Sequence, residues 1–362
     1  MTKDFIIQTQ GAKYAGSKLK VIPHIFNIVN GLPDIRSVLD GFTGTSRVAQ
    51  AFTKMGFDVT ASDTALWSEV FAKCYLLANK DAAFYQPMLD ELNNLKGVYG
   101  WFSQNYGGTE EQSKKPFQLK NTMKLDAIRE KIDSYNLDLE DKAVLLTSLI
   151  LALDEVDNTL GHYAAYLSKW SKRSYKDLTL KMPQKFFITT HNRVIRDDVL
   201  NVVKGQSFDL AYFDPPYGSS NQKMPSSRVR YNAYYHLWKT IILNDKPEVF
   251  GKAARRVDSK DTASYCPFED FHTDEHGNFV ALNALEELIK TTHARYIILS
   301  YSSSGRATKQ SLIDILNNNG KLLNLIELDH RRNIMSYLSW TKEWLSDKTP
   351  YKEYLFLLQK QL

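Results

Sequence analysis

Apolar and polar positions follow two alternating periods over the first 81 residues of the chain. The helical period predicts helices at 17–32, 46–55 and 67–77, and short apolar runs between them predict strands at 37–42 and 58–63. Pro23 is compatible with the first helix only in an early turn. A strand followed by a helix, repeated along the chain, predicts a parallel sheet with right-handed crossovers.

The pattern changes between residues 82 and 184. Strand signals are absent there, and the helical patterns at 119–135 and 140–156 dominate. Strand character returns at 185–189, 208–214 and 295–301. We therefore expect a domain formed by 1–81 and 185–362, with a mostly helical insertion at 82–184.

The last part of the chain holds two β-like runs, 322–328 and 354–358. A basic and aromatic connection, 331–348, separates them, and no helical crossover lies between them. Two late strands joined in this way favour an antiparallel edge on the sheet. The expected fold class is α/β, with a Rossmann-like sheet.

Composition narrows the class of protein further. A chain of 362 residues with 43% hydrophobic residues can bury a substantial core. We expect a cytoplasmic protein without membrane contact, because no apolar run reaches about 18 residues and the amino terminus lacks a signal pattern. Two cysteines, Cys74 and Cys266, provide neither a disulfide framework nor paired zinc ligands. The net charge of +5 is compatible with a polyanionic partner and does not require one.

The most informative motif follows the strand at 208–214 and reads Asp214-Pro215-Pro216-Tyr217. Because a strand interior rejects proline, the pair must lie at the carboxyl end, where open α/β sheets bind their ligands. The rigid prolines let the Asp214 carboxylate and the Pro215 carbonyl accept from one external donor, and Tyr217 supplies a flat face beside them. This arrangement suits a planar base with an exocyclic amino group. The alternative is a structural turn in which Asp214 is a cap and Tyr217 packs underneath.

A second motif, Asp40-Gly41-Phe42-Thr43-Gly44-Thr45-Ser46, joins the first strand to the next helix. Glycines in such a turn let the backbone approach a ligand. The three-glycine phosphate fingerprint is missing, which favours a nucleoside cofactor without phosphates. Asp63 ends the next strand and is placed to accept from ribose hydroxyls, although a cap of the following helix explains it equally well.

Three segments in order resemble the Dam-like, alpha-group adenine-specific DNA methyltransferases. These segments are Lys13-Tyr14-Ala15-Gly16-Ser17-Lys18, Phe42-Thr43-Gly44-Thr45-Ser46 and the tetrapeptide at 214–217. The resemblance covers most of the chain and implies a class I methyltransferase sheet. It also implies S-adenosylmethionine as cofactor, with Tyr14 and Lys18 flanking it and Asp63 on its ribose. The residues expected at the cofactor are Tyr14, Lys18, Asp40, Phe42, Gly44, Asp63 and Asp198, and Asp197 is an alternative to Asp198.

Two positions depart from the pattern of that family. Tyr14 stands where many members have tryptophan, and Thr43 stands where a smaller residue is usual. Neither change removes a functional group that cofactor binding needs.

The resemblance implies methylation of adenine N6 within a specific duplex sequence. The exocyclic nitrogen is a poor nucleophile, and hydrogen bonds from its protons to Asp214 and the Pro215 carbonyl would localise its lone pair. Tyr217 would stack on the base, which must leave the duplex to reach the pocket. No metal is required. The implied setting is a restriction-modification system, whose cognate endonuclease acts on the same site without a required complex.

Two basic groups are candidates for DNA phosphate contacts. They comprise Lys223, Arg228 and Arg230 in the loop after the tetrapeptide, and Lys252, Arg255 and Arg256 further on. A solvated face is the alternative for either group. We expect His162 and Tyr163, in the insertion, to pack internally.

Two other functions are compatible with these motifs. An RNA adenine methyltransferase can carry a similar tetrapeptide, but the long insertion and basic loops favour a DNA enzyme. A catalytically silent DNA-binding subunit would be expected to carry a damaged tetrapeptide or glycine turn, and both are intact. A nicotinamide oxidoreductase would need the missing glycine fingerprint.

Overall fold

The computed structural model describes residues 7–184, 191–218, 231–260, 266–277, 279–330 and 351–360. The chain forms two compact units, each built from segments that are distant in sequence. The first unit contains 1–24, 43–198 and 229–264, and the second contains 25–42, 199–228 and 265–362. The predicted strand at 185–189 and the connection at 331–348 lie outside the described residues.

The main sheet has seven mostly parallel strands. They are β1 (Ser37–Asp40), β2 (Asp58–Ser62), β5 (Arg193–Ile195), β6 (Ser207–Phe213), β9 (His293–Ser302), β10 (Gly320–His330) and β11 (Tyr351–Lys360). In the second unit the order is β10-β11-β9-β6-β1, and in the first unit β2 pairs in parallel with β5. β11 is antiparallel to both β9 and β10, so the predicted α/β class with an antiparallel edge is confirmed.

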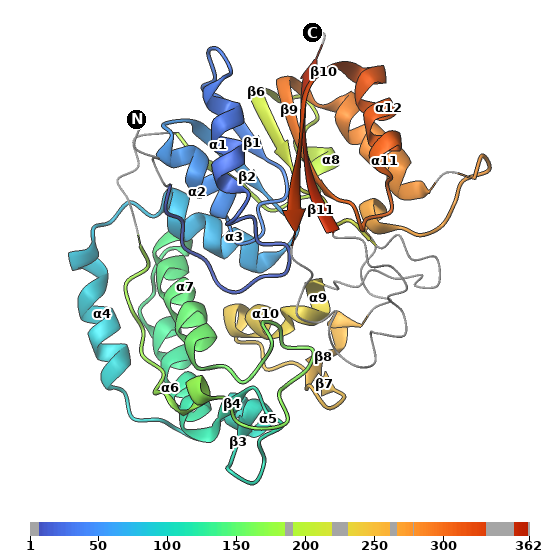
Figure 1. The fold of residues 1–362 in the computed structure, drawn as a ribbon. Coiled ribbons are helices and arrows are strands. Elements are labelled where there is room, and N and C mark those ends of the chain that lie inside the picture. Colours follow the sequence, from blue (N-terminus) through green and yellow to red (C-terminus); the bar gives the residue numbers. More distant parts are fainter. Residues whose placement is uncertain are drawn as a thin grey trace. The chain divides into compact units, whose positions relative to one another are not determined.

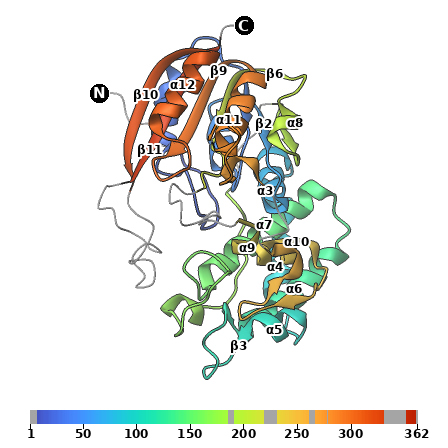
Figure 2. The same ribbon diagram turned by 90° about the vertical axis from the view of Figure 1, so that its right-hand side faces the viewer.

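Helices cover both faces of the strands in the second unit. They are α1 (Ile22–Asn30), α8 (Val199–Val202), α11 (Val280–Thr291), α12 (Lys309–Asn319) and the 3-10 turn Pro267–Glu269. Figures 1 and 2 show α11 and α12 side by side on one face and α1 on the opposite face. The prediction that the first helix begins at Ser17 was wrong. It begins at Ile22, which puts Pro23 in the first turn, where its missing N–H costs no hydrogen bond.

The first unit is largely helical. Its helices are α2 (Arg47–Lys54), α3 (Leu66–Ala72, continued by a π turn at Lys73–Leu77), α4 (Ala82–Asn94), α5 (Trp101–Tyr106), α6 (Leu119–Ser134), α7 (Leu139–Val156), α9 (Tyr231–Tyr234) and α10 (His236–Leu243). Two 3-10 turns, Lys172–Tyr175 and Val257–Ser259, complete the set. α6 and α7 confirm the helices predicted at 119–135 and 140–156. α7 begins where the Asp138 side chain accepts from the Asp141 amide at 2.8 Å, which satisfies one of the first free N–H groups.

Short strands also occur in the first unit. β3 (Gly107–Gly108) pairs in parallel with β4 (Phe117–Gln118), so the expectation that strands are absent from 82–184 was wrong at this point. β7 (Val249–Phe250) and β8 (Arg255–Arg256) form an antiparallel pair. Strands of two residues carry no periodicity that a sequence pattern could reveal.

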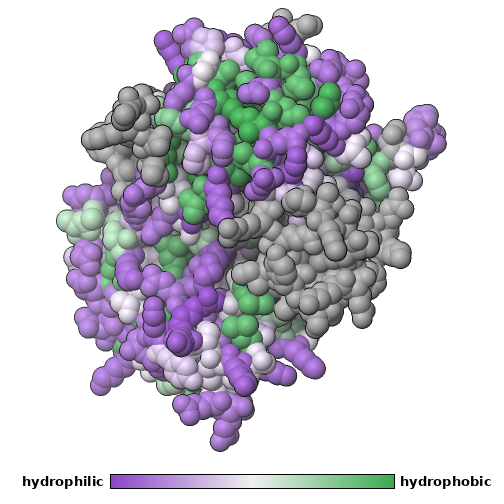
Figure 3. Space-filling view, in the orientation of Figure 1, coloured by the Kyte–Doolittle hydropathy of each residue, from purple (hydrophilic) through white to green (hydrophobic). Residues whose placement is uncertain are grey.

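The surface is mostly hydrophilic on the face drawn in Figure 3, with hydrophobic residues gathered in the region of β10 and β11. Within the described segments, no helix has the length and apolar character that a membrane crossing requires.

Candidate active site

The tetrapeptide follows directly after β6, a strand that is apolar on both faces. β6 lies between β1 and β9 and runs parallel to both, so its carboxyl end lies beside theirs. Burial on both faces explains why Leu210, Ala211 and Phe213 are all apolar. The chain leaves the sheet at Asp214, which is half-buried. The predicted position of the motif at the carboxyl edge of the sheet is confirmed.

Tyr217 is fixed by bonds to both its hydroxyl and its backbone carbonyl. The carbonyl accepts from the Arg306 amide at 2.9 Å and from the Tyr301 hydroxyl at 3.2 Å. The hydroxyl bonds to Oδ1 of Asp214 and to Oε1 of Glu353 at 2.8 Å. Burial, together with the negative charges of Asp214 and Glu353, raises the pKa of Tyr217 well above its usual range.

The turn after β1 is closely packed against β6 in the second unit. Gly41 donates its N–H to the Tyr212 carbonyl at 2.9 Å, and an added Cβ at Gly41 would lie 2.6 Å from the Phe213 ring. Asp40, at the end of β1, is 1% exposed. The Phe42 ring meets the Phe213 and Phe268 rings edge to face. The sequence therefore needs glycine at position 41 because the aromatic ring occupies the space of any side chain.

In the first unit, Gly44 and Asp63 are joined directly. The Gly44 amide donates to Oδ2 of Asp63 at 2.9 Å, and the Ala65 amide donates to Oδ1 at 2.9 Å. Gly44 has φ +51°, the left-handed region that favours glycine. Burial raises the pKa of the Asp63 carboxyl, and these backbone bonds oppose that shift. Asp63 therefore closes the turn before α3, but it is not the helix cap of the structural alternative, because the N-cap residue is Ala65, whose side chain makes no capping hydrogen bond.

Tyr14 lies in an aromatic group next to Gly44. Its ring stacks on Tyr235 with centroids 4.6 Å apart and lies 5.3 Å from the Tyr231 ring. An added Cβ at Gly44 would lie 3.1 Å from Tyr14. The adjacent Ala15 amide donates to the Tyr235 hydroxyl at 2.6 Å. The structure therefore brings together three predicted cofactor residues, Tyr14, Gly44 and Asp63.

The other two predicted cofactor residues of the first unit are placed differently. Lys18 is 7% exposed, and its Nζ donates to the Gly16 carbonyl at 3.3 Å. The Asp198 amide donates to the Asp197 carboxylate at 2.7 Å, so Asp197 acts as a local cap and Asp198 is half-buried.

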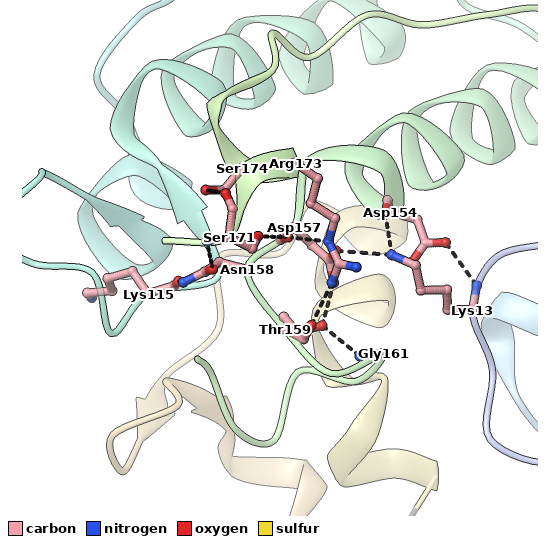
Figure 4. Close-up of polar contacts among 10 residues, drawn as sticks. All are labelled: Lys13, Lys115, Asp154, Asp157, Asn158, Thr159, Gly161, Ser171, Arg173 and Ser174. Carbon is pink, nitrogen blue, oxygen red and sulfur yellow. Dashed lines mark hydrogen bonds and ion pairs between the residues drawn. The ribbon is translucent and has the colours of Figure 1, made fainter. Parts of the chain in front are cut away.

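A polar network that sequence reasoning missed holds the segment before Tyr14. Asp157, which is 1% exposed, pairs with Lys13 Nζ at 3.2 Å and with Arg173 Nε at 2.8 Å. The Lys13 amide donates to Asp154 at 2.9 Å, and the Thr159 hydroxyl donates to Asp157. Figure 4 shows how Asp157, just after α7, lies between the two cations. The network ties the amino-terminal segment to the end of the longest helix of the insertion.

Three of the basic candidates for DNA contact lie within the described residues. Lys252 is exposed. Arg255 donates to the Ser259 carbonyl and lies over the Phe250 ring at 5.2 Å.

The prediction that Arg256 contacts DNA phosphates was wrong. It is 5% exposed and pairs with Asp245 at 2.6 Å and with Asp258 at 2.9 Å, so its guanidinium binds two acids of the same chain. Lys223, Arg228 and Arg230 lie outside the described residues. The expected packing of His162 and Tyr163 is confirmed, because they are 5% and 2% exposed.

A mostly parallel α/β sheet with an antiparallel edge, a glycine turn after β1 and an Asp-Pro-Pro-Tyr segment after β6 define a class I methyltransferase. Residues 14–304 match the family model described as D12 class N6 adenine-specific DNA methyltransferase. The chain belongs to that family.

Curated relatives carry the names modification methylase or type II methyltransferase. The chain is 31% identical over 320 residues to modification methylase StsI of Streptococcus sanguinis, covering 84% of this chain and 46% of that protein. It is 25% identical over 366 residues to type II methyltransferase M.FokI of Planomicrobium okeanokoites, covering 97% and 53%. It is 28% identical over 367 residues to type II methyltransferase M.NlaIII of Neisseria lactamica, covering 96% and 99%. The chain therefore spans about half the length of the first two relatives and nearly all of the third.

Proposed function

We propose that this chain is a site-specific DNA adenine-N6 methyltransferase that uses S-adenosylmethionine, and that it is the modification enzyme of a restriction-modification system. The observation that carries the proposal is the Asp214–Tyr217 segment at the carboxyl end of β6, in a chain of the D12 class family. The names of two relatives, modification methylase StsI and type II methyltransferase M.NlaIII, support the biological setting.

The proposed catalytic residues are Asp214, Pro215, Pro216 and Tyr217. The Asp214 carboxylate and the Pro215 carbonyl accept the two amino protons of adenine, which raises electron density on N6 as it attacks. These acceptors also stabilise the positive charge that develops on nitrogen. Tyr217 stacks on a base that has left the duplex. Pro216 keeps this short segment rigid, so the acceptors are aligned before the substrate arrives.

The side chains near the glycine turn have the chemistry that S-adenosylmethionine needs. Asp63 provides a carboxylate for ribose hydroxyls, and the aromatic face of Tyr14 is suited to a sulfonium. When bound, the cofactor supplies an electrophilic methyl group on sulfur. We assign cofactor binding to Tyr14, Lys18, Asp40, Phe42, Gly44, Asp63 and Asp198. Tyr14 also needs its neighbours Tyr231 and Tyr235 to hold the ring in place.

DNA recognition is assigned to the insertion at 82–184, and the catalytic domain to 1–81 and 185–362. Lys252 and Arg255 are the described candidates for phosphate contact, and Lys223, Arg228 and Arg230 are retained from the sequence alone. A cognate endonuclease is expected to act on the same site without a complex. We place the activity in the cytoplasm, where the host DNA lies.

Two measurements test the proposed function: methyl transfer to nucleic acid and binding of the cofactor. Purified protein is incubated with methyl-labelled S-adenosylmethionine and either duplex plasmid DNA or ribosomal RNA, and calorimetry measures cofactor binding separately. We expect label in DNA and heat from the cofactor. Label in RNA alone would support the RNA enzyme, and absence of both label and heat would support a silent subunit. Asp209→Asn, near the amino end of β6, is the matched control for substitution of Asp214, because it changes an acid of the same segment that lies away from the tetrapeptide.

A further inference from the structure

The hydroxyl of Tyr217 lies between two carboxyl groups. It contacts Oδ1 of Asp214 and lies 2.8 Å from Oε1 of Glu353. That same Oε1 accepts from the Ser300 hydroxyl at 2.6 Å. The four side chains therefore form one hydrogen-bonded chain at the rim of the sheet in the second unit.

Strand direction explains how Glu353 reaches this rim. β11 runs antiparallel to β9, so residues at its start lie beside the carboxyl end of β9. Glu353 pairs with Ser302, and Ser300 is therefore the diagonal neighbour on the same face of the sheet. β6 runs parallel to β9 and ends at the same rim with Asp214.

A count of protons limits how these groups can be charged. A tyrosine hydroxyl has a single proton and can donate it to only one of the two carboxyls. A bond to the other carboxyl then requires a proton on that carboxyl. Tyr217 keeps its own proton, because burial and the neighbouring acids raise its pKa well above the usual range. One of Asp214 and Glu353 therefore carries the second proton.

Burial decides between the two acids. Glu353 is 2% exposed, whereas Asp214 is half-buried. A carboxylate loses more hydration in the more buried position, so the proton is held there at lower cost. We propose that Glu353 is a positioning residue that stays neutral and donates its O–H to Tyr217, which directs the tyrosine proton to Asp214. The inference rests on the proposed function, because an ionised and oriented Asp214 is the acceptor that the amine needs.

Two substitutions of Glu353 separate this role from a merely structural one. Glu353→Gln keeps a donor towards Tyr217 and cannot become negative, so it should retain kcat within about threefold of the wild type. Glu353→Leu removes the donor, and kcat should fall by about 10- to 100-fold while KM for the cofactor stays within about threefold. Duplex DNA and methyl-labelled S-adenosylmethionine are the substrates.

A double variant tests whether Glu353 acts through the tyrosine hydroxyl. Tyr217→Phe keeps the ring and removes the hydroxyl. Adding Glu353→Leu to Tyr217→Phe should lower kcat by less than about threefold further, because the shared link is already absent. Equal and independent losses from the two changes would overturn the proposal.

Other outcomes are equally decisive. If Glu353→Gln is as impaired as Glu353→Leu, the ionised form is the working one and the proposal fails. If Glu353→Leu does not fold, infrared difference spectra of wild type against Glu353→Gln report the carboxylic acid stretch, and its absence overturns the neutral state. Asp214→Ala is measured in parallel. Loss of methylation in Asp214→Ala with wild-type rates in the Glu353 variants refutes this inference alone, whereas full activity in Asp214→Ala refutes the proposed function.

Discussion

Replacement of Asp157 by alanine should destabilise the protein strongly. The carboxylate is 1% exposed and bonds to two cations and to the Thr159 hydroxyl. Its removal deletes three charge-assisted bonds at once. The partners Lys13 and Arg173 are 40% and 33% exposed, so water recovers part of their hydration. We therefore expect a loss of about 2–4 kcal/mol in the free energy of unfolding, below the cost of leaving a fully buried cation unpaired.

The loss in the free energy of unfolding is measured by urea denaturation, with tryptophan fluorescence as the signal. Asp157→Asn keeps an oxygen acceptor for Thr159 without the charge, so its free energy of unfolding should lie between those of the wild type and Asp157→Ala. Lys13→Ala is the matched control, because its exposed ammonium should contribute less than about 1 kcal/mol. A loss of stability in Lys13→Ala as large as that in Asp157→Ala would contradict the central role of Asp157 in the network, and so would unfolding of Asp157→Ala at the wild-type urea concentration.

Three further predictions concern other parts of the chain. Lys252→Ala should weaken DNA binding equally for all sequences and reduce the salt slope by about 1, as gel-shift titrations at several salt concentrations will reveal. Burial lowers the pKa of His236 to about 4, while its N–H donates to the Tyr163 carbonyl. Because the folded pKa lies below the unfolded value of 6.5, stability is complete above pH 6.5 and falls as the pH drops towards 4. His236→Gln should flatten that part of the stability curve, and an unchanged slope would contradict the assignment. Gly41→Ala should cost about 1–3 kcal/mol through the clash with Phe213, measured as a lower melting temperature, and a wild-type value would contradict the packing.

Local patterns were sufficient for much of the fold. β1 and β6 contain adjacent apolar residues, β2 alternates polar and apolar residues, and α6 and α7 repeat apolar residues at helical spacing, so each element carries its own signal. The tetrapeptide could also be placed, because proline after an apolar run marks the end of a strand. β5 has only three residues, Arg193–Ile195, and offers no period to detect.

Contacts between distant segments could not be predicted in this way. Glu353 meets Tyr217 across 136 residues, and Asp157 meets Lys13 across 144. The sequence around each residue does not indicate which distant residue it will contact. Arg256 illustrates the same limit, because the basic cluster in the sequence does not indicate that this buried arginine pairs with Asp245 and Asp258.

The identity of the methylated atom, and whether its methylation depends on Asp214, decides whether this chain is an adenine-N6 methyltransferase. Duplex DNA treated with the protein and S-adenosylmethionine is digested to nucleosides, which are identified by mass spectrometry. We expect N6-methyldeoxyadenosine with the wild type and none with Asp214→Ala, although that variant still binds the cofactor in calorimetry. Methyl groups on cytosine, or N6-methyldeoxyadenosine formed at the wild-type rate by Asp214→Ala, would contradict this expectation.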